Sequence, residues 1–166
     1  YGMNTVMTNC SNNYGPYQFP EKLIPCLIQN ALQGKPLPIY GDGSNVRDWL
    51  HVKDHCEAID CVFSKSAAGE TYNVGGNNEW KNIDLARFIC KILDQEKGRS
   101  EEASFAQQIT FVQDRLGHDQ RYAIDASKIK KDLGWSPQTS VEECLLQTVR
   151  WYLMHQDWVQ DVQGKQ

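Results

Sequence analysis

The sequence is most constrained near its beginning, where a β-prone run leads directly into polar turn formers. Residues 5–9 favour a strand, and residues 11–16 follow it with serine, asparagine, glycine and proline. Such residues end a strand and present polar side chains at its carboxyl end, where α/β sheets bind ligands. A strand this short needs neighbouring strands. The opening therefore predicts part of a larger sheet with a ligand site at its edge, and we expect the chain to be a piece of a longer protein.

Helices and short strands mix irregularly along the rest of the chain. Apolar residues at helical spacing predict helices over residues 21–32, 53–66, 83–95, 126–133 and 141–155. Runs bounded by turn formers predict strands over residues 37–40, 47–52, 71–74 and 109–112. Because regular βαβ alternation is missing, we expect an α/β protein in which a mixed α+β lobe adjoins the tail of a parallel sheet. The expected division is residues 1–19 for the sheet and 20–166 for the lobe.

Size and charge exclude several classes of protein. A chain of 166 residues with 40% hydrophobic content can bury one ordinary core. The net charge is only -4, and no Lys/Arg run is long enough to follow a phosphate backbone, so no nucleic-acid partner is expected. No apolar stretch approaches the length of a membrane span, and no targeting signal is visible. We therefore expect a cytoplasmic protein with no membrane partner.

The cysteines and histidines give no metal signature. The six cysteines lack a Cys-x-x-Cys pair, and most lie among apolar residues, which predicts reduced and mostly buried thiols in the cytosol. His51 and His55 lie near Asp54 and Glu57, which hints at a metal. His51 falls on a predicted strand, however, so no metal site is predicted.

A series of motifs, in order along nearly the whole chain, resembles the extended short-chain dehydrogenase/reductase family. The motifs occupy residues 9–16, 19–25, 37–43, 47–55, 72–76, 81–83 and 114–119. Within that family, Asn-Cys-Ser-Asn-Asn, Arg-Asp-Trp and Gly-His-Asp favour the dTDP-glucose 4,6-dehydratase branch over relatives that use UDP- or GDP-sugars. The resemblance implies an NAD-dependent lyase. Such an enzyme oxidises the sugar at C4, eliminates water across C5 and C6, and returns the hydride to C6.

The family's catalytic and cofactor motifs are missing from this sequence. There is no glycine-rich dinucleotide turn, and none of the seven tyrosines begins a Tyr-x-x-x-Lys pair. We therefore expect the C-terminal, substrate-binding part of such an enzyme, with no catalytic residue and with NAD held mostly by an absent N-terminal half. The first strand should then leave apolar surface uncovered. The resemblance also implies a homodimer for the full-length protein.

The resemblance further implies a sugar-nucleotide pocket. A diphosphate favours guanidinium forks and amide donors, which suits Arg47 and Arg115 at the diphosphate and nucleotide and Asn12 at the diphosphate or sugar. Tyr40 is expected to pack against the base, because a flat apolar face suits a pyrimidine. The other expected substrate-binding residues are Glu21, Lys22, Leu23, Pro38, Asn82 and His118. The residues expected to approach the nicotinamide of NAD are Asn9, Cys10 and Ser11.

Other interpretations remain open at this point. Without the resemblance, Arg47 beside Asp48 suggests a surface ion pair, residues 12–13 a turn, and His118 a structural histidine. Leu116 replaces a proline common in relatives, which predicts a less rigid loop. The alternative functions are a related epimerase, decarboxylase or UDP-glucose 4,6-dehydratase, or a non-catalytic nucleotide-binding module. Tighter binding of a thymidine nucleotide than of a uridine nucleotide would favour the leading hypothesis over these three enzymes.

Overall fold

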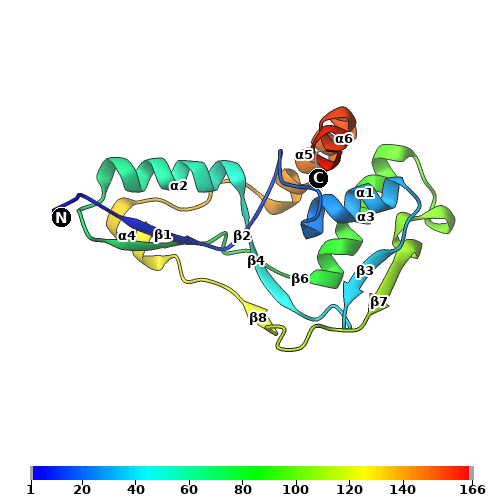
Figure 1. Ribbon diagram of the computed structural model, residues 1–166, viewed down its shortest axis with the longest axis horizontal. Coiled ribbons are helices and arrows are strands. Elements are labelled where there is room, and N and C mark those ends of the chain that lie inside the picture. Colours follow the sequence, from blue (N-terminus) through cyan, green and yellow to red (C-terminus); the bar gives the residue numbers. More distant parts are fainter. Residues whose placement is uncertain (1, 165–166) are drawn as a thin grey trace.

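The computed structural model describes residues 2–164 as a mixed α/β protein with three small sheets (Figure 1). One sheet is the parallel pair β1 (Met7–Cys10) and β5 (Thr71–Val74), and another is the parallel pair β3 (Leu37–Tyr40) and β7 (Ile109–Val112). The sheet between them has β4 at its centre. Its strands are β2 (Asn12–Tyr14), β4 (Val46–His51), β6 (Glu79–Lys81) and β8 (Arg121–Tyr122).

Helices cover these sheets at both ends of the molecule. They are α1 (Leu23–Leu32), α2 (Val52–Lys65), α3 (Asn82–Lys97), α4 (Ser127–Leu133), α5 (Val141–Met154) and α6 (Gln156–Gln163), with short 3-10 turns at Glu101–Ala103 and Phe105–Gln108. In Figure 1, α2 and α4 lie beside β1, whereas α1 and α3 lie at the other end beside β3 and β7. None of the helices in the described residues has the length and apolar character needed to cross a membrane.

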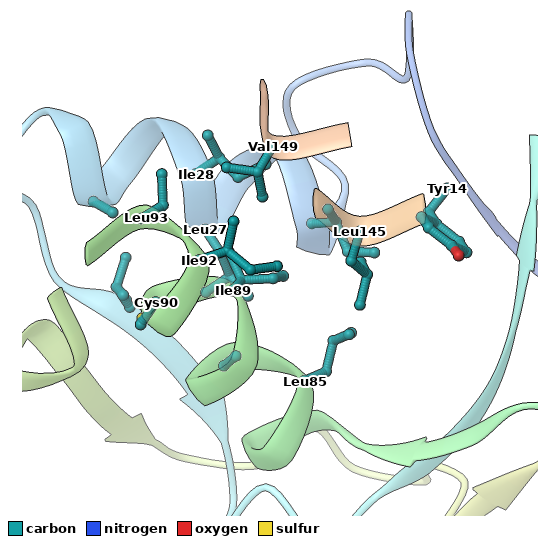
Figure 2. Packing of buried hydrophobic residues seen from close by; sticks show 14 of the residues in the cluster. Tyr14, Leu27, Ile28, Leu85, Ile89, Cys90, Ile92, Leu93, Leu145 and Val149 are labelled. Carbon is teal, nitrogen blue, oxygen red and sulfur yellow. The ribbon is translucent and has the colours of Figure 1, made fainter. Parts of the chain in front are cut away.

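The larger hydrophobic core lies between α1, α3 and α5, as Figure 2 shows. Each helix contributes one apolar face, because residues three and four positions apart lie on the same side of a helix. Leu27 and Ile28 of α1 meet Ile89 of α3 and Val149 of α5, and all are almost fully buried. This core fixes the three helices against the central sheet.

A smaller core joins β5 to α2 and α4. Its buried members include Ala58, Val62, Val74 and Ile129. Within residues 2–164, β1 pairs only with β5, and Met7, the first residue of β1, is 60% exposed. This is the uncovered apolar surface that was expected at the first strand.

The predicted elements are mostly confirmed, with some corrections. The strands at residues 37–40, 71–74 and 109–112 have the predicted bounds. Asn12–Tyr14 was expected to be a turn but forms β2, because pairing with β4 supplies hydrogen bonds that the local sequence does not indicate. The first strand runs over Met7–Cys10 rather than residues 5–9. Helix α6 and strand β6 were not predicted, since both are short and polar.

The prediction that most of the cysteines are buried is wrong. All six are free thiols, but only Cys90 and Cys144 are buried. Cys56 is exposed because it lies on the outer face of α2, whose buried residues are Asp54, Ala58 and Val62. Apolar neighbours in the sequence therefore did not imply burial here.

Candidate functional site

Every residue that was predicted to bind the sugar nucleotide lines one cavity of about 670 Å³. Those residues are Asn12, Glu21, Lys22, Leu23, Pro38, Tyr40, Arg47, Asn82, Arg115 and His118. Sequence reasoning missed the other residues of the lining, which are Cys26, Leu27, Trp49, Leu116, Gly117 and Asp119. The structure thus brings six separate stretches of the chain around one space.

Strand pairing assembles this cavity. Asn12 of β2 lies opposite Trp49 of β4, so their side chains share one face of the central sheet. Pairing of β4 with β6 sets Val46 opposite Lys81, and Asn82 then begins α3 at the cavity. In the third sheet Tyr40 lies opposite Val112, which brings the following loop, residues 114–119, to the cavity wall.

The two arginines of the cavity keep their charge available. Arg47 donates from Nη1 to the carbonyl of Val46 at 2.7 Å and from Nη2 to the carbonyl of Asp119 at 2.9 Å. Arg115 lies over the ring of Tyr40, with its guanidinium carbon 4.6 Å from the ring centre. Within residues 2–164 neither arginine forms an ion pair with a carboxylate. Two guanidinium groups that are not held in an ion pair favour binding of an anion.

The interpretation of Arg47 and Asp48 as a surface ion pair is wrong. Asp48 is 1% exposed, and its carboxylate accepts hydrogen bonds from the backbone N–H of Gly76 at 2.8 Å and of Asn78 at 2.7 Å. Adjacent residues of a strand point to opposite faces, so Asp48 turns away from the cavity while Arg47 lines it. Gly76 is required at this contact, because a Cβ there would lie 1.9 Å from the carbonyl oxygen of Trp49.

Tyr40 and the loop after β7 form an aromatic wall. The ring of His118 meets that of Tyr40 edge to face, with 6.2 Å between centroids. Nδ1 of His118 lies 2.6 Å from Oδ1 of Asp114, and this hydrogen bond lowers the pKa of the Asp114 carboxyl. Gly41 has a left-handed φ of 58°, and a Cβ there would lie 3.1 Å from Asp114. The loop is therefore anchored close to Tyr40.

Two buried polar atoms of the lining residues lack partners. The side-chain oxygen of Asn82 and the indole nitrogen of Trp49 are both buried without a hydrogen bond inside the described chain. Buried polar groups are usually paired, so these atoms indicate a place where a ligand could supply partners. The sequence did carry a signal for Trp49, because residues two apart on a strand share a face and Arg47 was already a candidate.

The predicted cofactor residues lie outside the cavity, at the carboxyl end of β1. Ser11 is 4% exposed, and its hydroxyl oxygen has no partner within the described chain. Cys10 accepts a hydrogen bond at Sγ from the amide of Asn13 at 3.4 Å, and Asn9 donates to Asn73 at 3.4 Å. Polar groups at the carboxyl ends of parallel strands suit a dinucleotide. This part of the structure therefore fits one edge of an NAD site.

His51 and His55 lie beside this segment without other metal-binding side chains gathered around them in residues 2–164. Within residues 2–164 no group of three metal-binding side chains comes together. His55 instead forms a hydrogen bond between its Nδ1 and the side-chain oxygen of Asn13 at 2.8 Å. Both ring nitrogens of His51 are buried without a hydrogen-bond partner among residues 2–164, and burial lowers its pKa.

Comparison with known proteins identifies the family. The family model for GDP-mannose 4,6 dehydratase matches residues 1–148, so the chain belongs to this family. The chain is 59% identical over 162 residues to the dTDP-glucose 4,6-dehydratase of Xanthomonas campestris pv. campestris (strain ATCC 33913) and 56% identical over 164 residues to that of Shigella flexneri. These matches cover 98% and 99% of this chain but 46% and 45% of the relatives. The chain thus spans about half the length of the curated relatives that it matches.

Solved structures agree with this assignment. The dTDP-glucose 4,6-dehydratase of Streptomyces venezuelae, solved with NAD and dTDP bound, is 44% identical with a TM-score of 0.84, and the match covers 98% of this chain and 48% of that one. The Thermotoga maritima UDP-glucose 4-epimerase, solved with UDP-glucose, is 28% identical with a TM-score of 0.78, and the match covers 93% of this chain and 47% of that one. The fold is therefore that of an extended short-chain dehydrogenase/reductase, which confirms the resemblance seen in the sequence.

Proposed function

We propose that this chain forms the sugar-nucleotide-binding part of an NAD-dependent dTDP-glucose 4,6-dehydratase. The observation that carries the proposal is the cavity in which Arg47, Arg115, Tyr40 and Asn82 meet. Its chemistry matches a nucleoside diphosphate, with cations for the diphosphate and a flat aromatic surface for the base. The identity to dTDP-glucose 4,6-dehydratases supports dTDP-glucose as the sugar nucleotide.

Each part of the cavity has a proposed role in binding. Arg47 and Arg115 neutralise the diphosphate, and Asn12 reaches the diphosphate or the sugar. Tyr40 packs against the pyrimidine, with His118 beside it. The N-terminus of α3 at Asn82 adds favourable potential for the diphosphate. Glu21, Lys22, Leu23 and Pro38 complete the wall.

The proposed catalytic chemistry lies beyond these residues. Bound NAD would supply the hydride transfer of this reaction, away from C4 of the sugar and back to C6. Asn9, Cys10 and Ser11 would border the nicotinamide, which the unpartnered Ser11 hydroxyl supports. The chain has no Tyr-x-x-x-Lys pair, so we propose no catalytic residue within it. A cytoplasmic, homodimeric full-length protein belongs to the same proposal.

A second candidate is a related enzyme that acts on a UDP-sugar. The likeness to UDP-glucose 4-epimerase favours it, although at 28% identity this likeness is much weaker than that to the dehydratases. The two candidates differ in the base that the cavity must accept, because thymine carries a methyl group that uracil lacks.

Titration calorimetry of the chain with dTDP-glucose and UDP-glucose, side by side, tests the proposal. We expect dTDP-glucose to bind more tightly, since an extra buried methyl group is worth about 1 kcal/mol, or roughly fivefold in affinity. Tighter binding of UDP-glucose would reject the dTDP assignment and favour the second candidate. Binding of neither would reject the proposal that this chain alone forms the nucleotide site.

A further inference from the structure

The loop that follows β2 is held by the last helices of the chain. This loop, residues 15–18, comes directly after the strand that carries Asn12 into the cavity. The hydroxyl of Tyr152, on α5, donates to the backbone carbonyl of Gln18 at 2.6 Å and lies 3.5 Å from that of Gly15. Tyr152 has no exposed surface, so this contact is shielded from water.

The same loop contains a residue in an unfavourable backbone conformation. Tyr17 has a φ of 62°, in the left-handed region that side chains larger than glycine seldom adopt. Tyr17 is 65% exposed as a residue, so burial does not explain the conformation. The ring instead packs edge to face on Trp151 of α5, with 4.6 Å between centroids, and on Trp158 of α6, with 5.5 Å. These contacts offset the local strain.

Hydrogen bonds connect this loop to β2 and to Ser11, the residue before β2. The side-chain amide of Gln18 donates to the backbone carbonyl of Asn13 at 2.8 Å. The side-chain amide of Asn13 donates in turn to the backbone carbonyl of Ser11 at 3.0 Å. A continuous path therefore leads from Tyr152 through Gln18 to the segment that holds Asn12.

None of the residues of α5 and α6 that contact this loop, nor Tyr17 itself, lines the cavity. Tyr17, Trp151, Tyr152 and Trp158 are all absent from its lining. Figure 2 shows the nearest link, with Tyr14 of β2 beside α5 at the border of the larger core. Any effect of these residues on ligand binding must therefore pass through the loop and β2.

We propose that Tyr152 is a positioning residue for the sugar-nucleotide site, which it serves by fixing the loop that follows β2 and so the placement of Asn12. The ligand in this inference rests on the proposed function of the cavity. The effect of Tyr152 on the loop does not depend on that function. A hydrogen bond from this hydroxyl limits the mobility of Asn12 before the ligand binds, so less conformational entropy is lost on binding.

The test compares Tyr152→Phe with the wild-type chain in two measurements. Hydrogen exchange followed by mass spectrometry should show faster exchange over residues 12–18. Calorimetry should show dTDP binding weakened by about fivefold, the loss expected for one net hydrogen bond. Tyr17→Ala should act in the same direction, and it guards against misfolding because Tyr17 lies at the surface, 65% exposed, rather than in the core.

Tyr72→Phe is the matched control. Tyr72 is 3% exposed, and its hydroxyl forms no hydrogen bond in the described part of the chain, so this variant should change neither measurement. If Tyr152→Phe lowers the free energy of unfolding but leaves exchange over residues 12–18 as in the wild type, the positioning role is overturned. If the wild-type chain does not bind dTDP, the proposed ligand is rejected, and the exchange result still supports or overturns the role of Tyr152.

Discussion

Arg115 places its guanidinium carbon 4.6 Å from the centre of the Tyr40 ring, and both side chains line the cavity. The cation occupies a face of the ring on which a base would otherwise stack. A nucleotide that uses Tyr40 must therefore share the ring with Arg115 or displace it. Either arrangement places the positive charge close to the base and the adjoining phosphates, which couples recognition of the two.

Replacing Tyr40 tests the aromatic wall. We expect Tyr40→Leu to weaken dTDP binding by about 1 kcal/mol, because the flat ring is lost while an apolar side chain is kept. Calorimetric titration measures the change. Tyr122→Leu is a matched control, since Tyr122 is 45% exposed against 41% for Tyr40 and lies outside the cavity. Equal affinities for the two variants would contradict a role for Tyr40 in packing against the base.

Asp48 should be critical for stability rather than for binding. In Asp48→Asn an amide replaces one carboxylate oxygen and cannot accept from both backbone N–H groups that Asp48 now serves. We expect a loss of about 1–3 kcal/mol in the free energy of unfolding, measured in urea. Asp60→Asn, at an exposed position of α2, is the control and should change little. An unfolding free energy unchanged in Asp48→Asn would show that these bonds contribute nothing.

Acid should destabilise the fold through His51. Burial lowers its pKa below 6.5, and its ring nitrogens have no partners to stabilise a charge within the described chain. The unfolded chain therefore binds more protons than the folded one once the pH falls below about 6.5, so the free energy of unfolding decreases from there downward. Among its neighbours, Asp54 opposes this shift and Lys53 adds to it. His55 has a pKa lowered by burial in the same way.

The variant His51→Phe separates the two histidines. Phenylalanine keeps a ring packed edge to face on Tyr14, where the ring centroids are now 5.3 Å apart, but it cannot take up a proton. We expect urea unfolding between pH of about 7 and about 5 to show a smaller decrease of stability in this variant than in the wild type. His55 and the carboxyls whose pKa values are lowered in the folded chain account for the remaining decrease. Identical pH dependence in the two proteins would contradict the assignment to His51.

The sequence was sufficient for elements whose signal is local. The strand at residues 37–40 could be predicted because a short β-prone run ends at the turn Gly41-Asp42-Gly43, and α1 could be predicted from apolar residues at helical spacing. Strand β2 could not be predicted, since Asn12–Tyr14 is a strand only through its pairing with β4. The expected boundary between residues 1–19 and 20–166 stays a prediction.

For the cavity, the resemblance supplied residues that spacing alone could not join. Arg47 and Arg115 lie far apart in the sequence, and the pairing of β3 with β7 and of β4 with β8 brings the loop of Arg115 to the cavity. Trp49 was missed although strand alternation placed it beside Arg47. The orientation of Asp48 was also missed, because its partners at Gly76 and Asn78 belong to a distant turn.

The most direct test of the central claim is calorimetric titration of dTDP into Arg47→Ala and Arg115→Ala. Arg150→Ala is the control, because Arg150 is an exposed arginine paired with Glu96 away from the cavity. We predict that each cavity variant binds dTDP about 10- to 100-fold more weakly than the wild-type chain, as expected for loss of a charge-assisted hydrogen bond, while the control binds as the wild type does. Wild-type affinity in both cavity variants would contradict the claim that this cavity binds a nucleoside diphosphate.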